Sequence, residues 1–372
     1  MKKLCALCGL GGEMIITTQF RMKLDEGKHG AQVSASSSDV ALISPSDVGL
    51  ERAAARFDLM TEVAQVDAYM QSLVTSPVLT ISEPARHVIA AGGKRLRAVL
   101  VLLAARLNHH DPAKAVAVAS AVELIHAASL VHDDLIDQSP RRRGLATVHS
   151  KWFRDAALVG GDYLFALAAT AIARSGEIGV LECLGRASVK ICEGEISLVR
   201  DVTPLDEALN AYYQKIAGKT AVLFEEGLKA AGLVSQASAT QIEALGRYGH
   251  NLGMAFQITD DVLDYVGDPA RLGKPVGGDL RRRQITLPLI YAANDGMPLA
   301  LRRTIDRIDD GASAEEIEAL LGYVQNSLGI QRAKEDAEHF CREASQALDL
   351  FPASPLRQTM RDIAWSVLVR DK

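Results

Sequence analysis

The sequence predicts an all-α protein whose helices pack as a bundle. Apolar residues recur at helical intervals from about residue 51 to the C-terminus. No convincing alternation of apolar and polar residues interrupts this pattern, and the connections between the helical runs are short. Several runs are apolar nearly all round, which is typical of a central helix enclosed by others.

The predicted helices follow one another in a single domain. Residues 1–50 carry little pattern and include a serine-rich stretch, so we expect a mobile N-terminal extension before a domain at 51–372. The first helix ends before Pro77, Pro84 starts a short second helix, and Pro112 starts the central one. The other helices are predicted at about 96–107, 155–174, 178–199, 205–231, 240–265, 285–294, 298–308, 314–327, 330–350 and 356–369.

Composition excludes several function classes. The chain has 372 residues and a formal net charge of −5, which argues against general nucleic-acid binding. Its five scattered cysteines indicate reduced thiols rather than a disulfide framework. No stretch reaches the roughly 18–20 uninterrupted apolar residues of a membrane span. We therefore expect a cytoplasmic protein.

The first chemical motif lies at the end of the central helix. The apolar run ends in Asp133, Asp134 and Asp137, and three arginines follow at 141–143. At helical spacing Asp133 and Asp137 share a face, with Asp134 about 100° away. Converging carboxylates that lose hydration need a cation between them, and Mg²⁺ suits hard oxygen ligands and phosphate oxygens. The motif predicts a Mg²⁺–diphosphate site, although one such motif alone also fits a solvated helix face.

A second motif strengthens the first. Asp260, Asp261 and Asp264 repeat the same spacing at the end of another apolar run, directly after Gln257. Two matched carboxylate trios on separate apolar helices are difficult to explain as surface decoration. The pair therefore favours a shared metal site over two solvated faces.

Cationic residues form candidate anion sites. Lys94 and Arg97 lie one helical turn apart, directly after a glycine pair, where backbone amides at a helix start can also bind an anion. His126 lies two turns before Asp133 on a similar face and could donate to a phosphate oxygen. Each signal has a plainer alternative, a solvated face for the two cations and a satisfied core position for the histidine.

Two further segments carry a lysine next to small residues. Lys219 and Thr220 follow a glycine within a helix, where the lysine could line a pocket or extend to water. Lys274 lies in the glycine-bearing loop 273–279 after the second trio, which could act as a lid over a metal site or simply connect two helices.

Taken together, these motifs give a family resemblance. The chain resembles the trans-isoprenyl diphosphate synthases, also called polyprenyl synthetases, from about residue 56 to 370, and residues 1–50 fall outside it. The motifs that match, in order, are GGKRLR at 92–97, ELIHAASLVHDDLIDQSPRRRG at 123–144, GDYL at 161–164, CEGE at 192–195, GKT at 218–220, FQITDDVLD at 256–264 and GKPVGGD at 273–279.

The resemblance implies a fold, a reaction and a set of site residues. The implied fold is an isoprenoid synthase-type bundle around a deep central cavity, usually a homodimer, and the reaction condenses isopentenyl diphosphate head-to-tail with an allylic diphosphate. It implies that several Mg²⁺ ions are held directly by Asp133, Asp137 and Asp260 and directly or through water by Asp134, Asp261 and Asp264. It implies an isopentenyl diphosphate pocket at Lys94, Arg97, His126 and Arg143. It implies an allylic side at Arg142, Lys219, Thr220, Gln257 and Lys274, with Lys219, Thr220 and Gln257 at the reacting centre.

Two positions depart from the family pattern. Gln284 stands where a lysine usually precedes the Thr-Leu-Pro sequence, and Leu198 stands where a glutamine usually follows the CEGE motif. Both departures concern the allylic side of the site and leave the predicted reaction unchanged.

Product length is predicted from the turn before Asp133. One helical turn rises about 5.4 Å, close to one isoprene unit. Ala128 and Ser129 lie one turn back, where short-chain members of the family carry an aromatic residue. Small residues leave the tunnel open, which predicts a product longer than C15, with C30–C50 favoured and C20 as the alternative.

Three other functions share part of this pattern. A terpene cyclase would share the fold and the metal but would not need Lys94 and Arg97. A regulatory subunit tends to lose one aspartate trio, and this chain keeps both. A catalytic subunit that needs a small partner stays open, because some members of the family are heteromeric.

Overall fold

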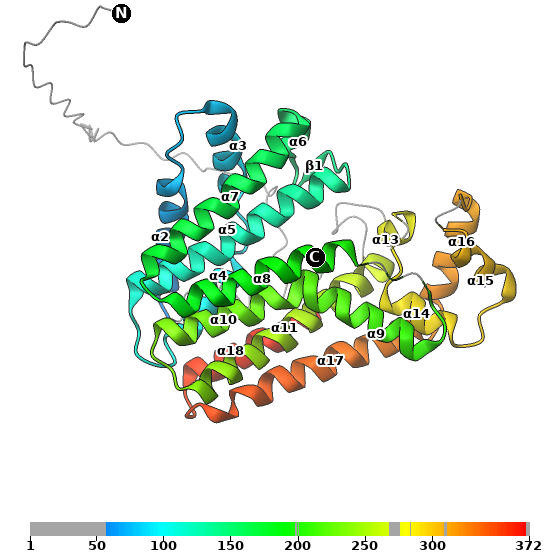
Figure 1. The fold of residues 1–372 in the computed structure, drawn as a ribbon. Coiled ribbons are helices and arrows are strands. Elements are labelled where there is room, and N and C mark those ends of the chain that lie inside the picture. Colours follow the sequence, from blue (N-terminus) through cyan, green and yellow to red (C-terminus); the bar gives the residue numbers. More distant parts are fainter. Residues whose placement is uncertain are drawn as a thin grey trace, which may run out of the picture. The chain divides into compact units, whose positions relative to one another are not determined.

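The described part of the protein is a helical bundle. The computed structural model describes residues 57–197, 199, 201–267, 276–282, 284–308 and 311–369. The predicted extension at 1–50 lies outside these residues. The long helices lie side by side with their axes roughly parallel (Figure 1). The predicted all-α class is confirmed.

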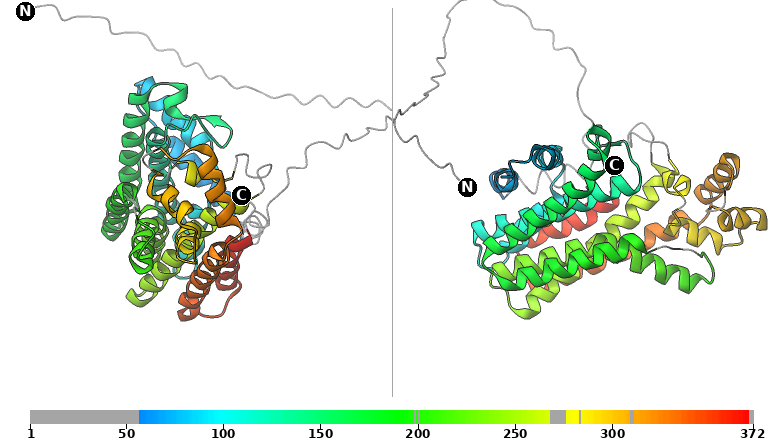
Figure 2. Two further views of the ribbon diagram at one scale, coloured as in Figure 1. Left: turned by 90° about the vertical axis from the view of Figure 1, so that its right-hand side faces the viewer. Right: turned by 45° about the horizontal axis from the view of Figure 1, so that its top comes forward.

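The first half of the bundle surrounds α5. Its helices are α2 (Leu59–Leu73), α3 (Leu79–Ala90), α4 (Leu96–Ala105), α5 (Pro112–Ile136), α6 (Val148–Lys151), α7 (Arg154–Ser175) and α8 (Ile178–Ile196). The second half contains α9 (Leu205–Ile216), η1 (Ala217–Ala221), α10 (Val222–Val234), α11 (Ala239–Val266), α13 (Gly278–Arg281), α14 (Leu287–Ala293), α15 (Leu299–Asp306), α16 (Ala314–Gln325), α17 (Gly329–Ala347), η2 (Leu348–Leu350), α18 (Pro355–Ser366) and η3 (Val367–Val369). The shorter helices α13 to α16 gather at one end (Figure 2).

Helix α5 forms the centre because nearly every face of it is apolar. Asp111 caps its N-terminus by accepting hydrogen bonds from the amides of Ala113 and Lys114, and Pro112 occupies the first turn, where no amide is needed. Along its flank, Gly161 of α7 lies beneath the His132 ring, whose Cε1 would stand 2.8 Å from any Cβ at that position. The glycine of the GDYL motif therefore allows α5 and α7 to approach closely.

Helices α5 and α7 are long and apolar enough to cross a membrane by length and composition, although neither is an uninterrupted apolar run. In the bundle, 78% of the apolar window of α5 is buried, and 50% of that of α7. The contacts with neighbouring helices explain the composition of α5, whereas α7 keeps an exposed apolar face.

Helix α11 joins two hydrophobic cores. Leu252 and Ala255, in its middle, belong to the core around α5, and Ile258 and Val262 belong to the core formed with α9, α14, α16 and α17. Its start carries a capping box in which Ser238 and Gln241 each accept from the other's backbone amide. The second carboxylate trio follows the point where the helix passes from one core to the other.

Three local features differ from the sequence prediction. Pro84 lies inside α3 rather than at its start, because the helix already begins at Leu79. The helix expected over 205–231 is divided by a π-helical turn, η1. A two-stranded hairpin, β1 (Arg141–Arg142) and β2 (Leu145–Ala146), lies where no strand was expected.

The hairpin turn accounts for the last difference. Arg143 and Gly144 form the two-residue turn, and both have positive φ, 52° and 78°. This is the geometry of a turn whose twist matches antiparallel strands. The hairpin brings Arg142 back to the end of α5, where it donates to Asp134.

Candidate active site

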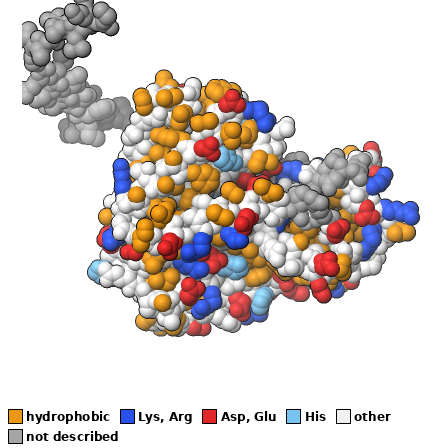
Figure 3. All heavy atoms as spheres, in the orientation of Figure 1, with side chains coloured by type: hydrophobic (Ala, Val, Ile, Leu, Met, Phe, Trp, Pro, Cys, Tyr) orange, Lys and Arg blue, Asp and Glu red, His pale blue; other side chains and the backbone are white. Residues whose placement is uncertain are grey.

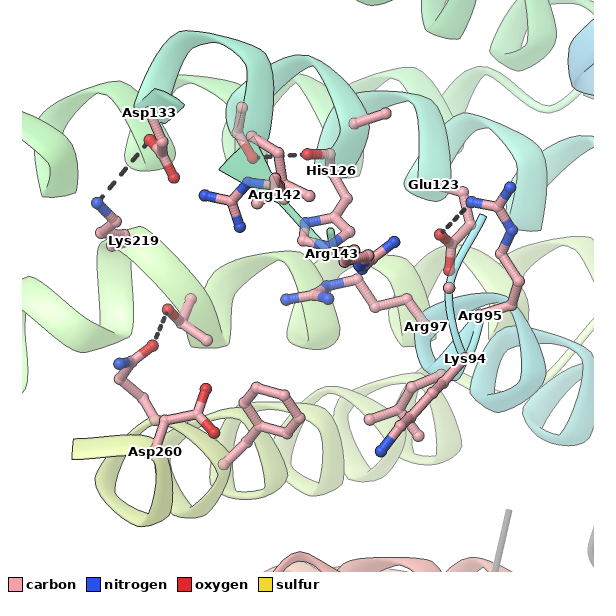
Figure 4. Close-up of a pocket in the computed structure, with 18 of the residues that line it drawn as sticks. Lys94, Arg95, Arg97, Glu123, His126, Asp133, Arg142, Arg143, Lys219 and Asp260 are labelled. Atoms are coloured by element: carbon pink, nitrogen blue, oxygen red, sulfur yellow. Dashed lines mark hydrogen bonds and ion pairs between the residues drawn. The ribbon is translucent and has the colours of Figure 1, made fainter. Parts of the chain in front are cut away.

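Most of the site residues predicted from the sequence line one cavity of about 760 Å³. Figure 4 shows Asp133, Lys219 and Asp260 at one end and Lys94, Arg95 and Arg97 at the other. His126, Arg142 and Arg143 lie between them. The carboxylates of two helices and the cations of the glycine-pair loop, far apart in sequence, therefore meet in one space. The predicted site residues that line this space are Lys94, Arg97, His126, Asp133, Arg142, Arg143, Lys219, Thr220, Gln257 and Asp260.

The carboxylate end is built around Asp133. Lys219 Nζ lies 3.8 Å from Asp133 Oδ1 and also pairs with Glu195 at the end of α8. Burial, with a smaller contribution from the charge of Glu195, raises the pKa of Asp133 to about 7 against the opposing effect of Lys219. Burial alone would lower the pKa of Lys219, but Asp133 and Glu195 outweigh it and raise that pKa. An acidic group poised near neutrality therefore lies beside a firmly protonated lysine.

Lys219 reaches this position because three helices approach closely. Gly194 of α8 packs against the backbone of η1, and a Cβ on it would lie 2.7 Å from the carbonyl carbon of Gly218. Gly253 of α11 contacts the other side of η1 at Ala221. The π-helical turn, a feature that often occurs at functional sites, thus holds Lys219 and Thr220 between α8 and α11. The glycines of the CEGE and GKT motifs serve this contact.

A chain of hydrogen bonds fixes the polar wall beside it. Thr220 donates its hydroxyl to Gln257 Oε1 at 2.7 Å, and Gln257 donates to Asp261 Oδ1 at 2.8 Å. Tyr212 donates to the second oxygen of Asp261 at 2.6 Å. Burial raises the pKa of Asp261 to about 8, with the charge of Asp279 adding to the effect. Both oxygens of Asp261 are therefore engaged away from the cavity.

The other predicted carboxylates also lie outside the cavity lining. Asp134 is buried and accepts from Arg142 Nε at 2.9 Å, which ties the end of α5 to the hairpin. Asp137 is exposed at the end of α5. Asp264 is buried and accepts from the amide of Asp279 at 2.8 Å. Within each trio, the structure thus brings one member, Asp133 or Asp260, to the cavity.

The cationic end surrounds His126. Burial lowers the pKa of His126 well below its usual value, and the charges of Arg97 and Arg143 lower it further. Arg97 stacks over Phe224, with its Cζ 4.3 Å from the ring centroid. Arg143 donates to the carbonyl of Gly92. Several cations around a neutral imidazole suit a multiply charged anion.

Two positions named from the sequence fall in parts of the chain that the structure does not describe. These are Lys274 and Leu198. Gln284 is described and donates its amide to the carbonyl of Asp279 at 2.8 Å.

Several cavity residues were given no role by the sequence. Glu123 and Glu195 line the cavity, and both belong to quoted motifs, so the motifs themselves were the available signal. Ile363 and Val367, from α18 and η3, also line it and carried no motif. Tyr212, outside the lining, orients Asp261 and carried no signal either.

The donor set fits Mg²⁺. The carboxylates that face the cavity from α5, α8 and α11 offer hard oxygen ligands, and no histidine or thiol competes at that end of the described cavity. Among the described residues, no three carboxylate, histidine or cysteine side chains already form a metal cage. Mg²⁺ usually binds through one or two carboxylates together with substrate phosphates, so such a cage is not required.

Comparisons with known proteins agree with the fold and identify the family. The family model for polyprenyl synthetase matches residues 78–324. Heptaprenyl diphosphate synthase component 2 of Geobacillus stearothermophilus is 36% identical over 313 residues, covering 84% of this chain and 97% of that protein. Octaprenyl diphosphate synthase of Escherichia coli K12 is 32% identical over 84% of this chain and 96% of that protein.

A solved structure gives the same result. The polyprenyl synthase from Caulobacter crescentus CB15, crystallised with calcium and isoprenyl diphosphate, superposes with a TM-score of 0.80. It is 33% identical and covers 87% of this chain and 98% of that one.

Fold and site therefore define an all-α prenyltransferase. The chain belongs to the polyprenyl synthetase family. The fold, the family and the enzyme class predicted from the sequence are confirmed.

Proposed function

We propose that this prenyltransferase condenses isopentenyl diphosphate with an allylic diphosphate, in the presence of Mg²⁺, to give a trans-polyprenyl diphosphate of C30–C50. The observation that carries the proposal is one cavity with carboxylates at one end and a cationic pocket at the other (Figure 4). The carboxylate end can bind one diphosphate through Mg²⁺, and the cationic end can bind the other diphosphate directly. A terpene cyclase would use the first end alone.

The chain's own residues bind and orient the two substrates. Lys94, Arg97 and Arg143 bind the diphosphate of isopentenyl diphosphate by charge-assisted hydrogen bonds. Lys219 neutralises the allylic diphosphate. The hydroxyl and amide dipoles of Thr220 and Gln257, held by the bonds described above, favour the positive charge that develops at the allylic carbon. Apolar side chains from α5, α8 and α11 exclude water from that carbon.

Magnesium would be held by Asp133 and Asp260, with the other aspartates of the trios in support. When bound, it supplies positive charge that makes the allylic diphosphate a better leaving group. The supporting aspartates act in this proposal through hydrogen bonds. Asp134 accepts from Arg142, and Asp264 accepts from the amide of Asp279. Asp261 accepts from Tyr212 and Gln257.

Small residues near Asp133 support a long product. Ser129 lines the cavity one turn back along α5, whereas Ala128 is fully buried and faces its neighbours. No aromatic residue at either position closes the space. The relatives named above are heptaprenyl and octaprenyl diphosphate synthases, which agrees with a long product.

We also propose a cytoplasmic homodimer. Helices α7 and α8 expose apolar side chains that a second copy would cover, and Figure 3 shows hydrophobic side chains over the face where α7 lies. These exposed residues are Leu158 and Val159 on α7, Phe153 directly before it, and Ile178, Leu181, Val189 and Ile196 on α8. Because one relative is named as component 2 of its synthase, a small partner subunit is the alternative.

One experiment tests activity, partner dependence and product together. Purified protein is incubated with isopentenyl diphosphate, Mg²⁺ and geranyl, farnesyl or geranylgeranyl diphosphate, and product length is read by chromatography. We expect elongation to C30–C50 by the protein alone, which sediments as a dimer. A monomer or inactivity with every primer would contradict the proposal in its homomeric form.

A further inference from the structure

The loop between α3 and α4 has an unusual backbone. Gly92, Gly93 and Arg95 have φ values of 59°, 145° and 49°, so three of the four residues at 92–95 are left-handed. Arg95 carries a Cβ, for which this conformation is disfavoured. The same loop carries Lys94 and leads directly into Arg97. Contacts outside the loop must therefore hold it in place.

The side chain of Arg95 provides one set of these contacts. It reaches across three elements: Nε donates to Asp67 Oδ1 on α2 at 2.9 Å, and Nη2 donates to the carbonyl of Ile89 on α3 at 2.9 Å. Nη1 lies 3.4 Å from Glu123 Oε2 on α5. The Arg95 side chain is only 8% exposed. A buried, multiply bonded guanidinium thus fixes the one non-glycine left-handed residue of the loop.

Glu123 fixes the other end of the loop. Its Oε1 accepts from the backbone amide of Ala98 at 3.0 Å. This amide belongs to the first turn of α4, where amides have no partner within the helix. A carboxylate at a helix start is also favoured by the helix dipole. Glu123, itself 4% exposed, therefore caps α4 from a neighbouring helix and pairs with Arg95 through its second oxygen.

The charges of Arg95, Glu123 and Asp67 also affect the neighbouring cations. Lys94, Arg97 and Arg143 all line this end of the cavity and repel one another when no anion is bound. Glu123, together with Asp67, more than offsets the positive charge of Arg95 that lies between them, which leaves one net negative charge at this end of the cavity (Figure 4). It can do so without occupying the anion site, because both of its oxygens are already engaged.

We propose that Arg95, Glu123 and Asp67, here called the Arg95 clamp, are positioning residues that preset Lys94 and Arg97 for the diphosphate of isopentenyl diphosphate. This inference rests on the proposed function and adds residues that bind no substrate in it. Preorganised cations bind an anion without first ordering the loop, so loss of the clamp weakens binding at this end and leaves the allylic end unchanged.

The test compares three clamp variants of the full chain, Glu123→Gln, Arg95→Lys and Asp67→Asn, by steady-state kinetics with each substrate varied. For the first two, we expect the KM for isopentenyl diphosphate to rise about tenfold, the size of one lost hydrogen bond to a charged group. The KM for the allylic diphosphate and kcat should stay within about twofold. Because the Asp67 side chain is 47% exposed, its variant should give the same pattern at about threefold.

Glu62→Gln is the matched control. Glu62 is also buried, and its carboxylate ties α2 to Arg106 and His110, which follow the end of α4 and lie away from the cavity lining. We expect Glu62→Gln and Glu123→Gln to lower the unfolding temperature by similar amounts. Glu62→Gln should change neither the KM for isopentenyl diphosphate nor the KM for the allylic diphosphate. If both KM values rise equally, or only stability falls in the clamp variants, the inference is wrong. If Glu123→Gln acts alone while Arg95→Lys and Asp67→Asn are silent, Glu123 is a direct contact and the clamp is refuted.

Calorimetry separates this inference from the proposed function. Isopentenyl diphosphate alone is titrated into wild-type protein and Glu123→Gln. If the wild type binds it but condenses nothing, the proposed function fails, and weaker binding by the variant still supports the clamp. If both proteins bind it equally, the clamp fails whatever the activity.

Discussion

The contact between α8 and η1 makes a sharp prediction for Gly194→Ala. A Cβ at this position would lie 2.7 Å from the carbonyl carbon of Gly218 and 3.0 Å from the Cα of Lys219. Carbon atoms pack at about 3.5–4.0 Å, so the two backbones would have to separate by roughly 1 Å. Backbone atoms cannot rotate aside as a flexible side chain would. The substitution should therefore move Lys219 away from Asp133.

The expected loss of stability in Gly194→Ala is the difference between two opposing effects. Overpacking costs about 1–3 kcal/mol, and replacing a helical glycine by alanine returns about 1 kcal/mol at most. Net destabilisation of up to about 2 kcal/mol should lower the unfolding midpoint by a few degrees. Displacement of a catalytic group by about 1 Å can cost on the order of a hundredfold in rate. We therefore expect kcat to fall on the order of tenfold to a hundredfold.

Gly185→Ala is the control on the same helix. Gly185 is exposed on α8, and a Cβ there would meet nothing within 4 Å. This variant should be as stable as wild type or slightly more stable, with unchanged kcat. Thermal unfolding by circular dichroism measures the stability, and steady-state kinetics with both substrates measure kcat. If Gly194→Ala keeps wild-type stability and kcat, or if Gly185→Ala loses as much, the close contact does not position Lys219.

Three further predictions concern the cavity. Ser129→Phe should shorten the product, because Ser129 lines the cavity, whereas Ala128→Phe should mainly destabilise a fully buried site. With the pKa of Asp133 raised to about 7, chiefly by burial, its ionised fraction falls to about one tenth at pH 6, so the Mg²⁺ concentration for half-maximal rate should rise as pH falls from 8 to 6. Glu195→Gln should shift that rise to lower pH, because Glu195 raises the pKa of Asp133. Gly93→Ala should raise the KM for isopentenyl diphosphate about tenfold or more, since φ is 145° and the Arg143 guanidinium carbon would lie 2.8 Å from the new Cβ.

Each of these has a contradicting result. An unchanged product from a stable Ser129→Phe protein removes Ser129 from the tunnel wall. Equal pH dependence in wild type and Glu195→Gln would show that the diphosphate substrate, common to both, titrates instead of Asp133. Gly296→Ala controls for backbone strain, because Gly296 has a φ of 75° and no neighbour within 4 Å of a Cβ. A similar rise of the KM for isopentenyl diphosphate in Gly296→Ala would show that the effect of Gly93→Ala is not specific to the loop between α3 and α4.

Short-range pattern determined much of this protein in advance. Apolar spacing of 3.6 residues predicted the helices, because burial of one face is a local property of a helix. Pro112 marked the start of α5, and the two aspartate trios marked the ends of α5 and α11. Residue chemistry alone also indicated hard oxygen ligands facing arginines and a lysine, which favoured magnesium and diphosphate.

Tertiary packing decided which side chains face the cavity. Asp133 and Asp134 are neighbours in sequence, yet one lines the cavity and the other bonds to the hairpin, because the hairpin packs against one side of α5 only. The position of Lys219 on the π-helical turn depends on contacts between helices far apart in sequence, and so does the capping of α4 by Glu123. Periodicity gives the buried face of each helix, but the partner that a polar side chain meets is set by how the helices pack.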